Sequence, residues 1–102
     1  MRQLSFSAMV RDDLQHIARY IARDNRTRAR TFVDELRQRS LLLIEQPDLG
    51  VAREDCAKGL RMLTHGRYLI FYSVSGQGIL IERVLHSARD LGRQFAIDDQ
   101  NL

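Results

Sequence analysis

The stretch RYLIFYSV, Arg67 to Val74, carries apolar side chains on both sides of the strand that it predicts. Successive side chains of a strand point to opposite faces of a sheet. Leu69 and Phe71 therefore point one way, and the alternate positions point the other way: Tyr68, Ile70, Tyr72 and Val74. A strand that is apolar on both faces is typical of the centre of a sheet. We therefore expect the neighbouring segments to supply the strands on either side of it.

Two further segments of strand character flank this central strand. LRMLT, Leu60 to Thr64, precedes it across a turn at His65 and Gly66, and ILIERVLH, Ile79 to His86, follows it across the turn SGQG. Turns this short join antiparallel neighbours, so the segments predict a three-stranded antiparallel meander. Strict alternation divides the last strand into Ile79, Ile81 and Leu85 on one face, and Leu80 and Val84 on the other.

The first half of the chain has helical periodicity after one short strand, Arg2 to Phe6. Ser7 stands where an N-cap is expected, and a first apolar stripe follows at helical spacing: Val10, Leu14, Ile17, Ala18 and Ile21. A second stripe ends before Pro47, which cannot donate the next helical hydrogen bond: Ala29, Phe32, Val33, Leu36, Leu43 and Ile44. The short link near RDNRT predicts an antiparallel helical hairpin. The expected fold is thus α+β: N-terminal strand, helical hairpin, then β-meander.

A helical hairpin covers only one face of such a sheet. Because the central strand is apolar on both faces, the other face needs a cover of its own. Two covers are open at this point: the C-terminal tail, Leu91 to Leu102, or another protein.

Composition limits the class of protein. The 102 residues are 44% hydrophobic and 28% charged, which predicts one globular domain over residues 1–102. We expect no membrane span, no signal peptide and a cytoplasmic location. The single cysteine, Cys56, excludes an internal disulfide, and we expect no metal or other cofactor. Lys58 is the sole lysine, so the positive charge is almost all arginine, which suits an acidic partner or a nucleic acid.

The segment ERVLHSARD, Glu82 to Asp90, has a catalytic and a structural interpretation. A ribonuclease needs a base, an acid and cations around one phosphate, and the available groups are Arg61, His65, Arg67, Tyr68, Arg83 and His86. Alternation, however, puts Arg83 and His86 on opposite sides of their strand. The structural interpretation has Arg89 and Asp90 fixing the chain at a corner, with His86 as a scaffold residue.

The order of these elements, with the segments QPDLG, GLR, RYLIFYSV and RVLHSARD, resembles the RelE/ParE superfamily of small bacterial toxins from type II toxin–antitoxin modules. The likeness runs from about Leu4 to Leu91 and is strongest to the ParE branch. Ser87 departs from the glycine that is frequent there. The matching positions are Gly59, Leu60, Arg61, Tyr68, Ile70, Tyr72, Arg83, His86, Arg89 and Asp90.

The resemblance implies a toxin that is neutralised by a cognate antitoxin, ParD-like or of another type. ParE-like members block DNA gyrase by protein contact, without catalysis and without specific DNA binding by the toxin alone. RelE-like members are ribosome-dependent mRNA endoribonucleases, and their frequent lysine cluster is missing here. Candidate residues for target or partner contact are Arg61, Tyr68, Tyr72, Arg83, His86 and Arg89; the nuclease alternative would use Arg61, Arg83 and His86.

Overall fold

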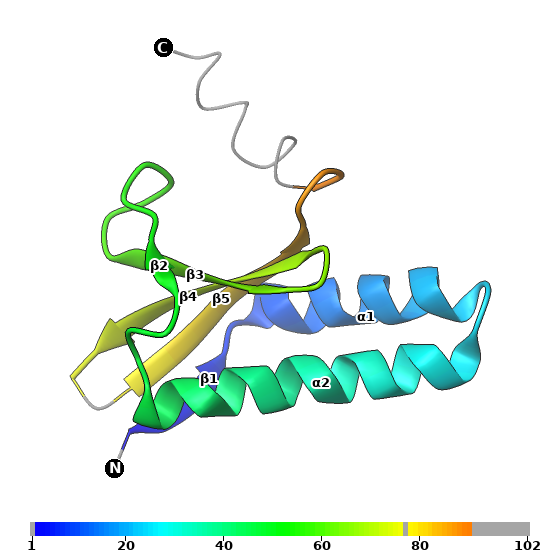
Figure 1. Ribbon diagram of the computed structural model, residues 1–102, viewed down its shortest axis with the longest axis horizontal. Coiled ribbons are helices and arrows are strands. Elements are labelled where there is room, and N and C mark those ends of the chain that lie inside the picture. Colours follow the sequence, from blue (N-terminus) through cyan, green and yellow to red (C-terminus); the bar gives the residue numbers. More distant parts are fainter. Residues whose placement is uncertain (1, 77, 91–102) are drawn as a thin grey trace.

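The computed structural model describes residues 2–76 and 78–90, and it forms two layers. A pair of helices, α1 (Ala8–Ala22) and α2 (Arg26–Glu45), lies side by side on one face of a sheet (Figure 1). The predicted α+β class and the helical hairpin are confirmed. The tail from 91 to 102, one of the two predicted covers for the second face, lies outside the described residues.

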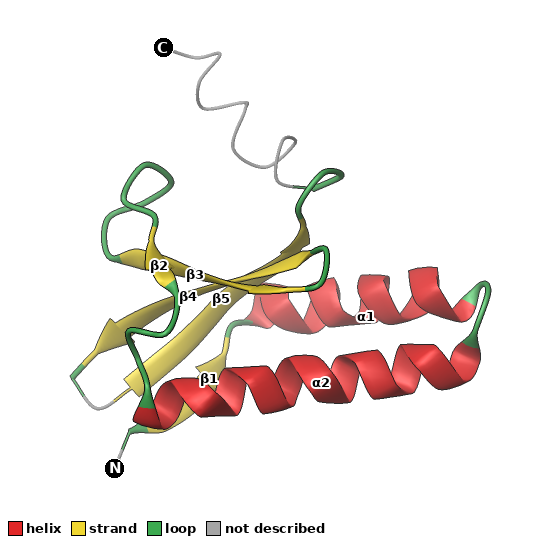
Figure 2. Cartoon of the chain, in the orientation of Figure 1, coloured by secondary structure: helices red, strands yellow, loops and turns green. Residues whose placement is uncertain are grey.

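The sheet has five strands in the order β1-β5-β4-β3-β2, more than the predicted meander (Figure 2). Its strands are β1 (Gln3–Phe6), β2 (Val51–Ala52), β3 (Leu60–His65), β4 (Tyr68–Ser75) and β5 (Gly78–His86). The meander is the β3-β4-β5 part, and β1 joins it in parallel beside β5. The sequence did not predict these two additions. Alternation of apolar residues identifies a strand but not the strand that pairs with it, so the β1–β5 pairing was missed. The two residues of β2 are too few to show an alternating pattern.

An irregularity in β5 corrects one sequence prediction. The register between β4 and β5 shifts after Phe71, which pairs with Arg83, while Tyr72 pairs with Ile81, leaving Glu82 as the extra residue. One extra residue reverses the face of every later side chain. Val84 therefore packs on the helix side with Ile79 and Ile81, and Leu85 belongs to the second face, the opposite of the predicted division.

The main core lies between the sheet and the helical hairpin. Its most buried members include Val10 and Leu43 from the helices and Ile70, Tyr72 and Ile81 from the strands. Ser7 caps α1 as predicted, since its hydroxyl accepts a hydrogen bond from the Val10 amide at 3.2 Å. Asn25 caps α2 in the same way through the Arg28 amide.

A smaller apolar cluster occupies the second face of the sheet. Its buried members are Leu60, Leu69, Phe71 and Leu85, with Cys56 and Met62 packed against them. Cys56 comes from the loop between β2 and β3, so the chain itself covers part of the face that the sequence left open. Within the described residues, no helix is long and apolar enough to cross a membrane.

Candidate functional site

The corner after β5 is built around the imidazole of His86. Its Nδ1 accepts hydrogen bonds from the amides of Ala88 at 3.2 Å and Arg89 at 3.1 Å. Asp90 closes the corner, because its carboxylate accepts the His86 amide at 2.9 Å and its own amide donates to the His86 carbonyl at 3.0 Å. A ring nitrogen that accepts two amides holds no proton, so Nδ1 serves to shape the backbone here.

Arg83 is held by a carboxylate from α1. Its Nε and Nη2 both lie 2.9 Å from the oxygens of Asp13, and this bonding raises the pKa of the Arg83 guanidinium. Asp13 also accepts the Val84 amide at 3.0 Å, while the Ser7 hydroxyl donates to the Glu82 carbonyl at 2.8 Å. The pairing of β1 with β5 ends at Phe6, opposite Ile81, so the next backbone groups of β5 have no partner in β1. The Asp13 and Ser7 side chains bond two of these groups instead, the Val84 amide and the Glu82 carbonyl.

A hollow of about 360 Å³ lies between α1, the end of β5 and this corner. Ile17 forms part of its apolar lining, and His16 and Tyr20 line it from α1. The guanidinium of Arg89 stacks over the Tyr20 ring at 4.2 Å and lies 3.5 Å from the hydroxyl of Tyr68. Arg89 therefore links the corner to the first helix across this hollow.

Arg61 and Tyr72 have a different position and hold the QPDLG loop against the sheet. The Arg61 guanidinium donates to the carbonyl of Gly50 at 2.6 Å and to that of Asp48 at 3.3 Å. The Tyr72 hydroxyl donates to the Pro47 carbonyl at 2.7 Å and accepts the Gly50 amide at 2.9 Å. A Cβ on Gly50 would lie 2.6 Å from the Met62 carbonyl oxygen, so the approach requires glycine.

The structure thus divides the six candidate residues into two groups. Tyr68, Arg83, His86 and Arg89 lie at the corner, whereas Arg61 and Tyr72 hold the loop. For the nuclease set, the functional groups of Arg61, Arg83 and His86 are bonded to the loop, to α1 and to the corner respectively. The register also puts Arg83 opposite Phe71 and His86 opposite Tyr68, on opposite faces of β5.

The outer side of the helical hairpin carries two adjoining hollows that no sequence pattern singled out. One, of about 920 Å³, runs between β1 and the helices over Leu4, Phe6 and Leu14; the other, of about 620 Å³, runs between the helices over Ala22 and Ala29. Ala18, Val33 and Arg37 line both, so they form one hairpin groove. The arginines that line it are Arg11, Arg19, Arg26, Arg30 and Arg37.

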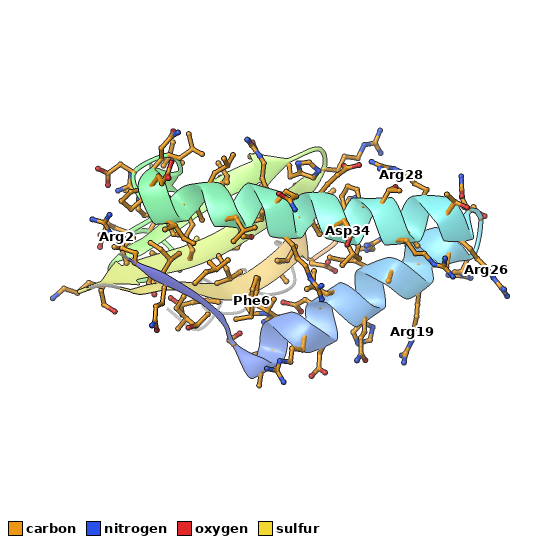
Figure 3. The ribbon with its side chains drawn as sticks, turned by 90° about the horizontal axis from the view of Figure 1, so that it is seen from below. Arg2, Phe6, Arg19, Arg26, Arg28 and Asp34 are labelled. Atoms are coloured by element: carbon orange, nitrogen blue, oxygen red, sulfur yellow. The ribbon has the colours of Figure 1, made fainter. Side chains whose placement is uncertain are left out.

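Figure 3 looks onto this side of the hairpin, with Arg19 on α1 and Arg26 at the start of α2. Asp34 is the acidic residue among the groove's lining side chains. Small and apolar side chains from both helices, Ala18, Ala22, Ala29 and Val33, line the groove together with these arginines. Helical spacing would have placed these arginines on the surfaces of α1 and α2. Only the packing of the two helices against each other shows that the arginines line one groove.

A charged cluster joins α2 to β3 on another side. The Arg28 guanidinium lies 2.6 Å from the Glu35 carboxylate, and the Nε2 of His65 lies 3.0 Å from its other oxygen. The sequence places Glu35 and Arg39 four residues apart, a spacing that predicts a helical ion pair. That prediction is wrong, because the Arg39 guanidinium donates to the Thr64 carbonyl at 3.1 Å instead.

This cluster gives a prediction for pH. The hydrogen bond from Arg28, and then that from His65, lowers the pKa of Glu35. A lowered acid pKa stabilises the fold fully above the pKa of the unfolded chain, about 4.3, and the contribution is lost as pH falls through the lower folded value. We expect Arg28→Ala to raise the pKa of Glu35, measured by NMR titration of the side-chain carboxyl carbon. Arg30→Ala, which removes a neighbouring arginine of α2, should leave it unchanged; equal shifts in both variants would contradict the assignment.

Across residues 2–76 and 78–90, no three His, Cys, Asp or Glu side chains are grouped so as to hold a metal ion. Burial raises the pKa of the Cys56 thiol, which disfavours the reactive thiolate.

Comparison with known proteins defines the class. The model of the ParE toxin of the type II toxin–antitoxin system parDE matches residues 4–91. The chain therefore belongs to the ParE toxin family.

A solved structure described as the chromosomal ParDE toxin–antitoxin system from P. aeruginosa has the same fold. It superposes with a TM-score of 0.73 at 22% sequence identity, covering 84% of this chain and 96% of that one. A search of curated proteins finds no match.

Proposed function

We propose that this ParE-family toxin inhibits DNA gyrase by protein contact, without catalysis of its own. The observation that carries the proposal is the use of His86 and Arg83 as structural groups. The His86 Nδ1 is occupied by two backbone amides and the Arg83 guanidinium by Asp13. General acid–base cleavage needs groups that converge on one phosphate, and these residues bond away from each other.

We place the gyrase-contacting surface at the corner and the adjoining part of α1. Arg89 and Tyr20 form a stacked cation and aromatic ring on its rim, and arginine and tyrosine are enriched among the residues that dominate binding energies. Family membership supports gyrase as the target, and the fixed backbone of the corner provides a rigid surface for contact.

The experiment tests both targets with the same protein. Purified toxin is added to gyrase with supercoiled or relaxed plasmid, and to translating ribosomes with a defined mRNA. We expect loss of gyrase turnover and intact mRNA. Arg89→Glu should weaken gyrase inhibition by on the order of tenfold or more, as for a dominant interface arginine. Lys58→Glu, in the exposed loop between β2 and β3, is the charge-reversal control away from this surface. Cleaved mRNA together with unaffected gyrase would overturn the proposal.

We further propose that the antitoxin fills the hairpin groove with an acidic amphipathic helix. The alanine, valine and leucine side chains that line the groove fit the apolar face of such a helix, and the arginines that line it fit the carboxylates of the helix. We expect Arg30→Glu with Arg37→Glu to weaken binding of the antitoxin encoded beside this gene, measured by calorimetry. Arg67→Glu, in the exposed turn between β3 and β4, should bind as tightly as the unaltered toxin. Undiminished binding by the groove variant would refute this location.

The runner-up function is a ribosome-dependent endoribonuclease. One observation favours it: His16, Tyr20 and Arg89 line a single hollow, where an imidazole, a phenol and a cation could meet a phosphate. His86→Gln is the discriminating variant. If it remains folded but loses toxicity together with mRNA cleavage, the nuclease function replaces gyrase inhibition.

A further inference from the structure

The tip of the helical hairpin concentrates the positive charge of the protein. Residues 19–30, which include the end of α1, the link and the start of α2, contain five arginines and one acidic residue, Asp24. Their formal charge of +4 exceeds the +3 of the whole chain, so the other residues are close to neutral in sum. Basic charge that is clustered at one place on a fold is the electrostatic feature of a surface that binds nucleic acid.

Three of these arginines are exposed: Arg19, Arg23 and Arg26. Across residues 2–76 and 78–90, their guanidinium groups have no hydrogen bond or ion pair with another side chain or with the backbone. Arg28 differs, because its guanidinium is bonded to Glu35. Figure 3 shows the Arg19 and Arg26 side chains pointing away from the body of the protein. The three arginines therefore keep all their N–H donors for a ligand.

The spacing of these arginines suits a row of phosphates. Arg19 and Arg23 are one helical turn apart, with about 5–6 Å between their Cβ atoms. Arg26 follows Arg23 by three residues across the link, at most about 11 Å away. The charges of one DNA strand follow each other every 3.4 Å or so along the duplex axis, so each of the three guanidinium groups can meet a different phosphate.

The composition of the tip favours the backbone of a duplex over a single strand. Proteins that bind single strands stack the bases on exposed aromatic rings. Residues 21–31 contain no aromatic side chain, and the ring of Tyr20, just before them, is already stacked with the guanidinium of Arg89. Contacts between arginine and phosphate fix a protein on a duplex but carry no sequence information. Charge without aromatic groups thus fits duplex phosphates of any sequence.

We propose that Arg19, Arg23 and Arg26 bind the backbone phosphates of duplex DNA without sequence preference. This binding goes beyond the proposed contact with gyrase, because it requires no gyrase and is measured on the toxin alone. The two sites are neighbours, since Arg19 and Arg23 lie within one helical turn of Tyr20. A toxin that contacts gyrase through Tyr20 and Arg89 then holds the tip arginines close to the DNA on which that enzyme acts.

Fluorescence anisotropy of a short labelled duplex tests the binding to the full-length toxin over a series of salt concentrations. Three phosphate contacts give a slope of about −2.7 for log affinity against log salt, so the affinity should fall about 40-fold between about 50 and 200 mM salt. Arg23→Gln leaves two contacts, and its affinity should be lower and should fall only about 12-fold over the same range.

Lys58→Gln is the matched control, because it removes the same charge from the exposed loop between β2 and β3, at the other end of the molecule from the tip (Figure 1). Its salt dependence should equal that of the unaltered toxin. Circular dichroism checks that both variants are folded.

Three outcomes would overturn the proposal. Equal salt dependence of Arg23→Gln and Lys58→Gln would mean that binding follows net charge and not the hairpin tip. Absence of binding to the duplex at about 50 mM salt would mean that the tip takes no DNA. Tighter binding of a single strand of the same length, or a marked preference between two duplexes of different sequence, would mean that bases rather than phosphates are recognised.

Discussion

Replacing Asp13 by alanine is expected to lower the free energy of unfolding by about 3–5 kcal/mol, the usual cost of removing one partner of a buried ion pair. The Asp13 and Arg83 side chains are only 10% and 20% exposed, so the loss of the carboxylate leaves a largely buried charge without its partner. The change also leaves the Val84 amide without its acceptor. Since domains of this size are stable by roughly 5–15 kcal/mol, the variant should be close to unfolding. Urea denaturation followed by circular dichroism measures the loss.

The neighbouring carboxylate provides the control. Asp12 is exposed on α1, and Asp12→Ala should change stability by less than about 0.5 kcal/mol. A double variant, Asp13→Leu with Arg83→Met, should recover much of the loss, because it removes the unpaired charge along with its partner. If Asp13→Ala is as stable as Asp12→Ala, the ion pair is not what holds α1 to the end of β5.

Tyr72→Phe is expected to cost about 1–3 kcal/mol, because it removes the partner of the buried Gly50 amide and of the part-buried Pro47 carbonyl. The Tyr72 hydroxyl bonds both the Pro47 carbonyl and the Gly50 amide, and the residue is completely buried. Tyr68→Phe is the matched control in the same strand. Its hydroxyl has one long contact, 3.5 Å from Arg89, and its loss should cost less than about 0.5 kcal/mol.

Thermal and urea unfolding of the two phenylalanine variants compare the two hydroxyls directly. Hydrogen exchange adds a local measurement, because the Gly50 amide should exchange faster in Tyr72→Phe and at an unchanged rate in Tyr68→Phe. Equal stability of the two variants would mean that the QPDLG loop is held by Arg61 alone.

Local structure was the most predictable part of the chain. The Ser7 cap, the helical stripes and the end of α2 before Pro47 all depend on neighbours within a few residues, and the structure confirms them. The three strands of the meander follow for the same reason, since short turns join each to the next. Their boundaries moved by only one residue, as for Gly78 at the start of β5.

Pairings between distant residues were not predictable. The β1–β5 pairing joins Phe6 to Ile81, and nothing in a period-two pattern identifies the strand beside it. The bulge at Glu82 reversed the predicted faces of Val84 and Leu85, because one inserted residue leaves the composition of the strand unchanged. The hairpin groove likewise exists only because α1 and α2 pack against each other.

The sequence by itself determined the α+β class, the helical hairpin, the meander and the ParE resemblance, because periodicity, caps and turns are local properties and the motif is written in residue order. Only the tertiary structure decided which groups the charged side chains of that motif contact. Arg83 could have faced a phosphate, but Asp13, seventy residues earlier, occupies its guanidinium. The Nδ1 of His86 accepts two backbone amides of the corner that follows it, a contact that the order of residues does not show. The contacts of a charged side chain depend on which groups lie within bonding distance of it, and the folded backbone sets those distances.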